Sequence, residues 1–452
     1  MRCKLRDDYR NLFKFIIKAY YSENFEEEVM SFLSESKMDK QELCKIISTL
    51  CGTNVDYSSN FIENLKKAIK SYKQDGKVVN KVKDCSMECV DEKGEILCQK
   101  TCPFDAIFID NEKNCAYIDK EKCTDCGFCV DVCPTGGIMD KVQFIPLFDI
   151  LKSKSPVVAI VAPAIIGQFG NDVTMDQLRT AFKKLGFTDM IEVAFFADML
   201  TLKESIEFDN HVKDENDFMI TSCCCPMWVA MVKKVYSNLV KHVSPSVSPM
   251  VAGGRVLKKL SPYCKVVFIG PCIAKKSEAK EEDIKGAIDF VLTFEELRDI
   301  FDAFHIVPSK LEGDFSSKYA SRGGRLYAHT GGVSIAVSEA VERIFPEKHK
   351  LFSAIQANGI RECKEMLTKV QDGEIKANFI EGMGCIGGCV GGPKAIASKD
   401  EGRDRVNKFA QNSEINVAVD SECMHGILHA LDIHSIEDFK NEKKIELLER
   451  DF

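Results

Sequence analysis

A run of four closely spaced cysteines constrains this chain more than any other feature of its 452 residues. Cys123, Cys126, Cys129 and Cys133 are separated by two, two and three residues, and Pro134 follows the last of them. This spacing lets one loop wrap around three corners of a [4Fe–4S] cubane, while the fourth cysteine reaches a neighbouring cluster. Zinc is the alternative, but cysteine pairs that bind zinc usually come as two separated knuckles. The run therefore predicts an iron–sulfur cluster.

A second, less regular cysteine run precedes the first. Cys85, Cys89, Cys98 and Cys102 are separated by three, eight and three residues, and Pro103 follows. Both runs resemble the bacterial ferredoxin pattern, in which the last cysteine of each run binds the other cluster. We therefore expect two [4Fe–4S] clusters. The predicted ligand sets are Cys85, Cys89, Cys98 and Cys133 for one cluster, and Cys102, Cys123, Cys126 and Cys129 for the other.

Cysteine is also the residue type in which the composition is unusual. The chain has 21 cysteines, far above ordinary usage but below the density of a small disulfide scaffold. In a reducing compartment, so many thiols favour metal ligands or redox groups over disulfide bonds. Four cysteines of the first 120 residues stand outside any tight spacing and are interpreted as packing residues; they are Cys3, Cys44, Cys51 and Cys115.

Composition further limits localisation and partners. No uninterrupted apolar run reaches bilayer-spanning length, and the N-terminal residues mix charged with apolar side chains. We therefore expect a cytoplasmic protein with no membrane span. The formal net charge of −8 argues against nucleic acid as a partner.

The pattern along the chain predicts three domains. Residues 1–80 carry apolar residues every three or four positions, as in "FIENLKKAIKSY", and predict a helical N-terminal domain. Residues 81–145 hold both cysteine runs and predict a ferredoxin-like domain. In residues 146–452, β-branched runs such as "CKVVFIG" alternate with amphipathic segments such as "TFEELRDIFDAF". This alternation predicts a parallel α/β fold, in which ligands bind beyond the carboxyl ends of the strands.

Three further cysteine motifs follow strand-like runs of this α/β domain. They are "TSCCCPMW" at 221–228, "GPCIAKKSE" at 270–278 and "EGMGCIGGCVGGP" at 381–393. Disulfide bonding between adjacent cysteines is strained, so the triple cysteine favours a reactive role over cross-linking. Because each motif lies at a strand end, we expect all three to converge on one pocket. The glycines of the third motif would let backbone approach a cofactor closely.

The three motifs resemble the three signatures of the [FeFe]-hydrogenase H-cluster domain, and the resemblance covers essentially residues 82–450. The extra cysteine of "TSCCCP" resembles that of a minority subgroup. The resemblance implies an α/β, two-lobed H-cluster domain beside the 2[4Fe–4S] ferredoxin-like domain. It also implies an H-cluster, which is a [4Fe–4S] cubane bridged to a two-iron unit that carries CO, cyanide and an azadithiolate.

The resemblance assigns roles to named residues. The cubane ligands would be Cys225, Cys272, Cys385 and Cys389, and Cys389 would also bridge to the two-iron unit. Lys275 would donate to a cyanide ligand, and Met383 would pack beside the bridging CO. Cys224 would exchange protons with the bridge amine. Glu204, Ser244 and Glu207 would continue the proton path toward the surface.

Elementary chemistry leaves alternatives for two of these assignments and sets a condition for a third. Glu204 and Glu207 are three residues apart on a predicted helix, so they share a face, and such a pair is usually solvated. Either Lys275 or Lys276 could face the anionic cyanides, where a compact ammonium suits a small anion. A thiol such as Cys224 can shuttle protons if its surroundings bring its pKa near ambient pH.

The chain departs from the family pattern at several positions outside the cysteine ligands. Gly270 and Ala164 stand where relatives carry a methionine and a serine near the two-iron unit. His211 occupies the place of a surface arginine at the outer end of the proton path. Cys223 is the surplus thiol of the first signature, and Trp228 is interpreted as a core residue.

The resemblance implies an enzyme that catalyses 2 H⁺ + 2 e⁻ ⇌ H₂. A ferredoxin-type electron carrier and dedicated maturation enzymes are the implied partners. One alternative is a hydrogen or redox sensor that holds the same cofactor with little turnover. Another is a non-catalytic iron–sulfur assembly protein.

Overall fold

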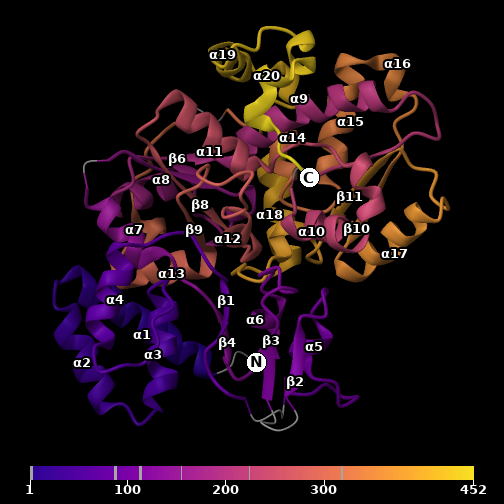
Figure 1. Ribbon diagram of the computed structural model, residues 1–452. Coiled ribbons are helices and arrows are strands. Elements are labelled where there is room, and N and C mark those ends of the chain that lie inside the picture. Colours follow the sequence, from indigo (N-terminus) through magenta and orange to yellow (C-terminus); the bar gives the residue numbers. More distant parts are fainter. Residues whose placement is uncertain (1–3, 86–88, 111–114, 154, 223, 317–318) are drawn as a thin grey trace.

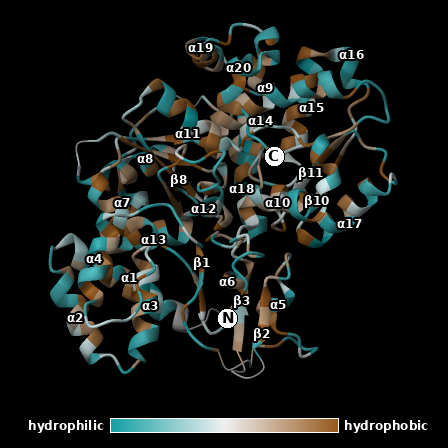
Figure 2. Cartoon of the chain, in the orientation of Figure 1, coloured by the Kyte–Doolittle hydropathy of each residue, from teal (hydrophilic) through white to brown (hydrophobic). Residues whose placement is uncertain are grey.

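The computed structural model describes residues 4–85, 89–110, 115–153, 155–222, 224–316 and 319–452. Four helices form its N-terminal unit. They are α1 (Lys4–Tyr21), α2 (Phe25–Glu35), α3 (Lys40–Leu50) and α4 (Phe61–Lys70). Figure 2 shows that each combines hydrophobic and hydrophilic residues, which is the pattern of a helix with one buried face. Ile16, Ile47 and Leu65 are among the residues that fill the core between them.

The ferredoxin-like unit is built from two short antiparallel strand pairs. Strand β1 (Val79–Lys81) pairs with β4 (Ile138–Asp140), and β2 (Ile107–Asp110) pairs with β3 (Cys115–Ile118). Two short helices, α5 (Leu97–Lys100) and α6 (Phe128–Val132), each lie within one cysteine run. Because β1 precedes both runs and β4 follows them, their pairing ties the two ends of the unit together.

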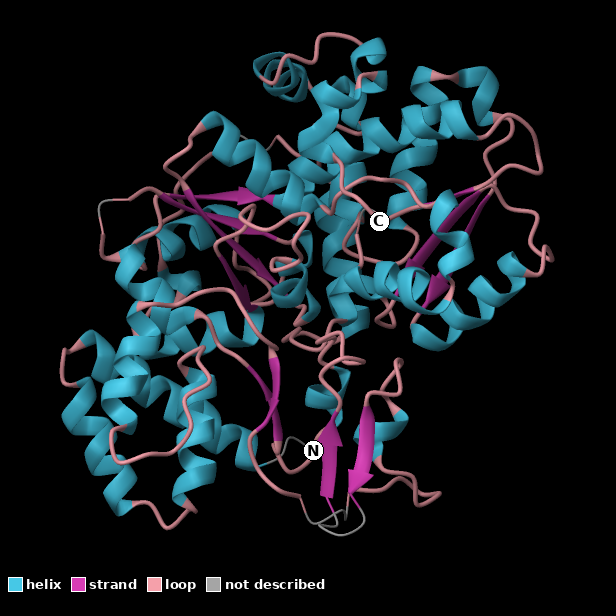
Figure 3. Cartoon of the chain, in the orientation of Figure 1, coloured by secondary structure: helices cyan, strands magenta, loops and turns pink. Residues whose placement is uncertain are grey.

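The α/β part contains two separate parallel sheets, as Figure 3 shows. The first has the strand order β6-β5-β8-β9, with β5 at Val157–Val161, β6 at Asp189–Glu192, β8 at Lys265–Gly270 and β9 at Phe290–Thr293. Helices cover it on both faces, which is why its strands are continuous apolar runs. They include α8 (Met175–Lys184), α11 (Pro249–Leu260), α12 (Ala274–Glu278) and α13 (Phe294–Ala303).

The second parallel sheet has the order β10-β11-β7. Its strands are β7 (Met219–Ile220), β10 (Ala354–Asn358) and β11 (Phe379–Met383). Helices α10 (Pro226–Val235), α15 (Gly332–Ile344) and α17 (Ile360–Gln371) pack against it. The prediction of parallel α/β structure is thus confirmed. The cysteine motifs begin where β7, β8 and β11 end, so two belong to this sheet and one to the first.

Helix α9 (Val193–His211) joins the two lobes. It packs against α11 on one side and against α15 and α14 (Arg322–Leu326) on the other. Most of its residues are buried, including polar ones, so it carries no solvated stripe. The remaining helices are α7 (Phe144–Leu151), α16 (Pro346–His349), α18 (Lys399–Gln411), α19 (Glu422–Ala430) and α20 (Glu442–Ile445). No helix of the described ranges is both long and apolar enough to cross a membrane.

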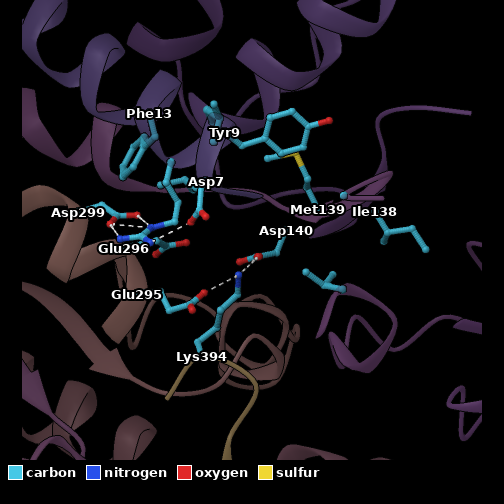
Figure 4. A pocket seen from close by; sticks show the side chains of 15 residues that line it. Asp7, Tyr9, Phe13, Ile138, Met139, Asp140, Glu295, Glu296, Asp299 and Lys394 are labelled. Carbon is cyan, nitrogen blue, oxygen red and sulfur yellow. Dashed lines mark hydrogen bonds and ion pairs between the residues drawn. The ribbon is translucent and has the colours of Figure 1, made fainter. Parts of the chain in front are cut away.

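Ion pairs hold the three units together at their common junction (Figure 4). The guanidinium of Arg10 on α1 donates to both carboxylate oxygens of Asp299 on α13, with the Nη2–Oδ1 bond at 2.6 Å. Asp140, the last residue of β4, accepts from Lys394 at 3.0 Å. A cavity of about 120 Å³ lies between these pairs. The N-terminal helices, seen at the lower left of Figure 1, therefore contact the α/β part directly.

Candidate functional site

The structure brings together the two predicted cysteine sets of the ferredoxin-like unit. One cavity is lined by Cys85, Cys89, Cys98 and Cys133. A second is lined by Cys102, Cys123, Cys126 and Cys129. Burial and the neighbouring thiols raise the pKa of Cys98 to about 11 and that of Cys126 to about 12. A thiol with such a raised pKa gives up its proton when a cation binds it, and an iron–sulfur cluster supplies one.

The cysteines of the three later motifs also converge. Cys225 immediately precedes α10, with Pro226 at the first helical position, and its Sγ accepts from the Gly384 backbone at 3.4 Å. Burial raises the pKa of Cys272 to about 12, and the nearby Cys225 and Cys389 contribute to this rise. Cys385 has a strongly raised pKa for the same reasons. The four thiols therefore form one electrostatically coupled group.

Glycines allow the motif loops to approach one another this closely. A Cβ on Gly384 would lie 2.8 Å from the Cβ of Met227 in the first motif. A Cβ on Gly392 would lie 2.6 Å from the Pro271 carbonyl oxygen in the second motif. Both distances are too short for a side chain, so these glycines serve contacts between motifs. The sequence analysis expected the glycines of the third motif to let backbone approach a cofactor. The contacts between motif loops described here are a separate role of these glycines.

Cys389 differs from the other three thiols of the group. A hydrogen bond with Cys224 and the charge of Lys275 lower its pKa, against the effect of burial. Lys275 forms an ion pair with Glu278 on α12, with Nζ 2.6 Å from Oε2. Cys224 also donates to the Tyr327 carbonyl oxygen at 3.7 Å. The predicted proton-exchange cysteine, the predicted bridging cysteine and one ammonium thus meet at one place.

The structure separates the roles of the two adjacent lysines. Lys276 is fully buried and points away from the cysteines, where it donates to Asp140 at 2.7 Å and pairs with Glu296. Lys275 instead interacts with the thiols of Cys224 and Cys272. Glu278 is a further buried residue of this site that the sequence reasoning missed, although it lies within the quoted second motif.

The predicted proton path is buried along α9. Glu204 has no exposed surface, and both of its oxygens accept from the Thr221 hydroxyl at 2.8 Å. Glu207 is 8% exposed and accepts from the Ser244 hydroxyl at 2.6 Å. The alternative of a solvated face for this pair is therefore wrong. Thr221, which begins the first motif, is a hydrogen-bond partner of Glu204 that the sequence reasoning did not single out.

The outer end of this path opens into a cavity of about 130 Å³. Glu207, Ser244 and His211 line it, together with residues of the 216–218 loop. His211 is exposed, and its Nδ1 lies 2.9 Å from the Glu207 carbonyl oxygen. The cavity connects a buried carboxylate and hydroxyl to an exposed imidazole, which is a suitable arrangement for taking protons from water.

A buried lysine accompanies the path. Lys203 pairs with Glu207, and its Nζ lies 3.2 Å from Oε1 of Glu449 near the C-terminus. Burial acts to lower the pKa of Lys203, but the two carboxylates outweigh burial and raise it. Burial raises the pKa of Glu449. Neither Lys203 nor Glu449 belongs to a motif, so no local signal in the sequence pointed to them.

Other predicted residues have simple positions. Met383 is 1% exposed at the end of β11. Trp228 is a core residue, and its indole nitrogen donates to the Thr221 carbonyl oxygen at 2.8 Å. Ala164 is fully buried after β5, and a Cβ on Gly270 would meet the Phe268 ring at 2.5 Å. Cys44, Cys51 and Cys115 are buried. Cys3 and Cys223 lie outside the described residues.

The donor set fits an iron–sulfur group better than a single ion. Cys225, Cys272, Cys385 and Cys389 are all of intermediate exposure as residues, unlike the buried Cys363 of the same lobe. In the described parts of the chain, no three His, Cys, Asp or Glu residues are placed to hold one metal ion. A cubane takes one thiolate at each of four separated corners, as this arrangement offers.

Comparison with protein families agrees with this geometry. Residues 155–393 match the model "Iron only hydrogenase large subunit, C-terminal domain". Residues 116–139 match the model of a 4Fe-4S binding domain. Iron–sulfur cluster binding is therefore a property of this chain.

Characterised relatives fall into two groups. The NADP-reducing hydrogenase subunit HndD of Solidesulfovibrio fructosivorans is 26% identical over 60% of this chain and 55% of its own length. Iron hydrogenase 1 of Clostridium pasteurianum is 26% identical over 65% of this chain and 67% of its own length. A probable cytosolic Fe-S cluster assembly factor of Aedes aegypti, AAEL012261, is 27% identical over 49% of this chain and 57% of its own length. The chain spans only part of each relative.

A solved structure shares the fold. A variant of the apo [FeFe]-hydrogenase HydA1 from Chlamydomonas reinhardtii superposes with a TM-score of 0.57 at 22% identity, over 68% of this chain and 97% of that one. The match covers nearly all of HydA1, so the two-lobed α/β part has the H-cluster domain fold. Because the hydrogenase family model spans more than half of the chain, this protein belongs to the family defined by the C-terminal domain of the iron-only hydrogenase large subunit.

Proposed function

We propose that the protein is an [FeFe]-hydrogenase that catalyses 2 H⁺ + 2 e⁻ ⇌ H₂ and belongs to the TSCCCP subgroup. The observation that carries this proposal is the meeting of Cys224, Cys389 and Lys275 in a protein that also buries Glu204 and Glu207 with hydroxyl partners. Hydrogen formation joins protons with electrons, so it needs a proton route and an electron route to one place. Both routes can be followed in named residues.

Four cysteines would hold the cubane of an H-cluster, namely Cys225, Cys272, Cys385 and Cys389. When bound, the two-iron unit supplies the redox chemistry of hydrogen. Lys275 is suited to bind its anionic cyanide ligands, because the ammonium is buried and keeps its charge through Glu278. Met383 would pack beside it. The two-iron unit carries CO, cyanide and an azadithiolate, which the side chains of the protein do not supply. Dedicated maturation enzymes would therefore install it.

The electron route would run from a ferredoxin-type carrier through two [4Fe–4S] clusters. Cys126 of the second set packs in one apolar cluster with Cys225, Cys272 and Met227. A Cβ on Gly127 would lie 2.4 Å from the Ile273 side chain, so the two units are in direct contact there. This contact would place the nearer cluster next to the cubane. The proposed enzyme is cytoplasmic and works without a membrane partner.

The proton route would run from the surface cavity through Glu207 and Ser244 to Glu204, and then to Cys224. Each carboxylate along it has a hydroxyl donor within 2.8 Å. Cys224 would hand the proton on, because its thiol lies beside Cys389 and Lys275. A protein that only holds a cubane does not need a buried proton route. These residues therefore favour an enzyme over the assembly function of the Aedes aegypti relative.

One experiment tests this proposal. The protein is matured anaerobically with the two-iron unit, and its infrared spectrum and its hydrogen production from reduced viologen are measured. We expect CO and cyanide bands together with hydrogen production. Bands without turnover would favour a sensor, whereas a protein that contains iron and sulfide but shows neither bands nor turnover would favour an assembly function.

The lysine beside the proton path leads to a separate prediction. When Glu207 takes up a proton, Lys203 keeps Glu449 as a counter-ion and is not left as an unpaired buried charge. We expect E449Q to make this proton uptake unfavourable and to slow hydrogen production about tenfold, which corresponds to about 1.4 kcal/mol of added barrier.

The matched control for this prediction is E446Q, which changes an exposed glutamate of the same C-terminal segment. It should keep both the rate and the pH profile of the unmodified enzyme. Rates would be measured with reduced viologen over the pH range in which all three proteins remain folded. Equal rates for E449Q and E446Q would show that Glu449 has no part in the path.

A further inference from the structure

Lysines gather in a cleft between the N-terminal helices and the ferredoxin-like unit. The cleft, called here the lysine cleft, has a volume of about 570 Å³. Its lining includes Lys45, Lys77, Lys81 and Lys120, while Asp56 is the one carboxylic acid among the described residues that line it. Pockets that bind small molecules usually enclose about 300–1,000 Å³. The lysine cleft thus has the size of a ligand site and a net positive lining, in which Lys81 also pairs with Asp84 at 2.7 Å.

Two more lysines, which do not line the lysine cleft themselves, lie next to Gly76, which does. The Nζ of Lys141 lies 3.8 Å from the position that a Cβ on Gly76 would take. Lys280 donates to the Gly76 carbonyl oxygen. Next to them, Lys77 donates to the Cys123 carbonyl oxygen at 2.6 Å. Ammonium groups from three different parts of the chain therefore surround one short loop.

The charge of Lys141 is not balanced by an ion pair among the described residues. Lys141 is 7% exposed, and burial, followed by the charge of Lys280, lowers its pKa to about 8. Asn54, turned so that its amide oxygen faces the lysine, offers it a neutral partner at 2.7 Å. Within the described ranges, no carboxylate comes within ion-pair distance of Lys141; Asp75 and Asp125 act on it from further away. Such an ammonium is costly to bury unless an anion joins it.

The rest of the lining suits an organic ligand. Val55, Val79 and Ile118 provide apolar surface, and the hydroxyls of Ser48 and Thr53 lie at the wall. Lysine ammonium groups bind phosphate as compact point charges. We propose that the lysine cleft binds a phosphorylated organic anion of about nucleotide size. This site is distinct from the proposed hydrogen chemistry and does not depend on it.

The neighbouring cluster gives the lysines a competing role. Cys123 both lines the lysine cleft and belongs to a predicted cluster set, so the alternative is that the lysines only balance the charge of that cluster's thiolates. The two roles differ in what a missing lysine changes. Anion binding must weaken in the first case, whereas only the reduction potential of the cluster changes in the second.

The test uses the full chain with its iron–sulfur clusters in place. Calorimetry would measure the binding of ATP, inorganic pyrophosphate and adenosine. We expect ATP to bind more tightly than pyrophosphate and adenosine to bind far more weakly than either, since the phosphates bind the lysines. Removing one exposed lysine, in K45Q or K120Q, should weaken ATP binding about tenfold. K18Q, which changes an exposed lysine of α1 outside the lysine cleft, is the matched control and should bind ATP normally.

Several outcomes would overturn the proposal. One is a protein that binds neither ATP nor pyrophosphate, while K120Q shifts the potential of the neighbouring cluster. Another is equal ATP affinity in K45Q, K120Q and K18Q. A third is unchanged ATP binding in K45Q and K120Q combined with slower electron transfer from an acidic ferredoxin, which would make the lysine cleft a carrier surface. None of these measurements requires hydrogen production, so they are independent of the proposed function.

Discussion

Replacing Cys224 by alanine is expected to lower hydrogen turnover by a factor of about 10²–10⁴, which is the usual contribution of a positioned proton-transfer group. The Cys224 thiol lies between Cys389 and the Tyr327 carbonyl oxygen, beside Lys275. No cysteine ligand of the proposed cubane is changed, so the iron content should stay the same. Turnover with reduced viologen, iron content and the infrared spectrum of the matured protein would be measured together.

A serine variant and a distant cysteine separate proton transfer from packing. C224S keeps nearly the size of the side chain but replaces a thiol that can ionise by a hydroxyl that does not. It should therefore lose as much turnover as C224A. C423A changes a half-buried cysteine on α19 and should retain full activity. Normal turnover in C224S would show that Cys224 carries no proton, and loss of the infrared bands in C224A would assign it to cofactor binding.

Local sequence patterns were sufficient to predict the elements that hold the site. The strand-like runs before the three cysteine motifs correspond to β7, β8 and β11, and the amphipathic segment "TFEELRDIFDAF" corresponds to α13. These signals are local because a strand buried on both faces must be apolar throughout, and a helix on a sheet must be apolar on one face. The placing of Pro226 at the start of α10 follows from the preference of proline for a first helical turn.

Contacts between distant residues were beyond the reach of those patterns. The sequence left open which of Lys275 and Lys276 faces the cysteines, because the partners that bury Lys276 come from β4 and α13. The pairing of Lys203 with Glu449 joins residues from α9 and the C-terminal segment. Buried charges are placed by the partners that tertiary structure supplies, and a single sequence carries no local signal for such partners.

Asparagine in place of Asp140 is expected to destabilise the contact between the ferredoxin-like unit and the α/β part by about 3–5 kcal/mol, the usual cost of removing one partner of a buried ion pair. Asp140 is 5% exposed, and two ammonium groups bind it, Lys276 at 2.7 Å and Lys394 at 3.0 Å. The amide keeps the shape of the side chain but loses its charge. Lys276, which is fully buried, would keep Glu296 alone as a charged partner.

The pH dependence of stability gives this prediction its sharpest test. Burial acts to raise the pKa of Asp140, but Lys276 and Lys394 outweigh it and hold the pKa below its ordinary value. A carboxylate with a lowered pKa in the folded state stabilises fully above its unfolded pKa of about 3.9 and loses that contribution as pH falls further. The stability of D140N should lack this loss as pH falls. Hydrogen exchange in β1, β4 and α12 would measure the difference.

D302N is the matched control, because Asp302 joins Lys14 across an exposed interface at 3.9 Å and should contribute about 0–1 kcal/mol. Equal protection of β4 in D140N and D302N would show that the Asp140 ion pairs do not hold the ferredoxin-like unit in place.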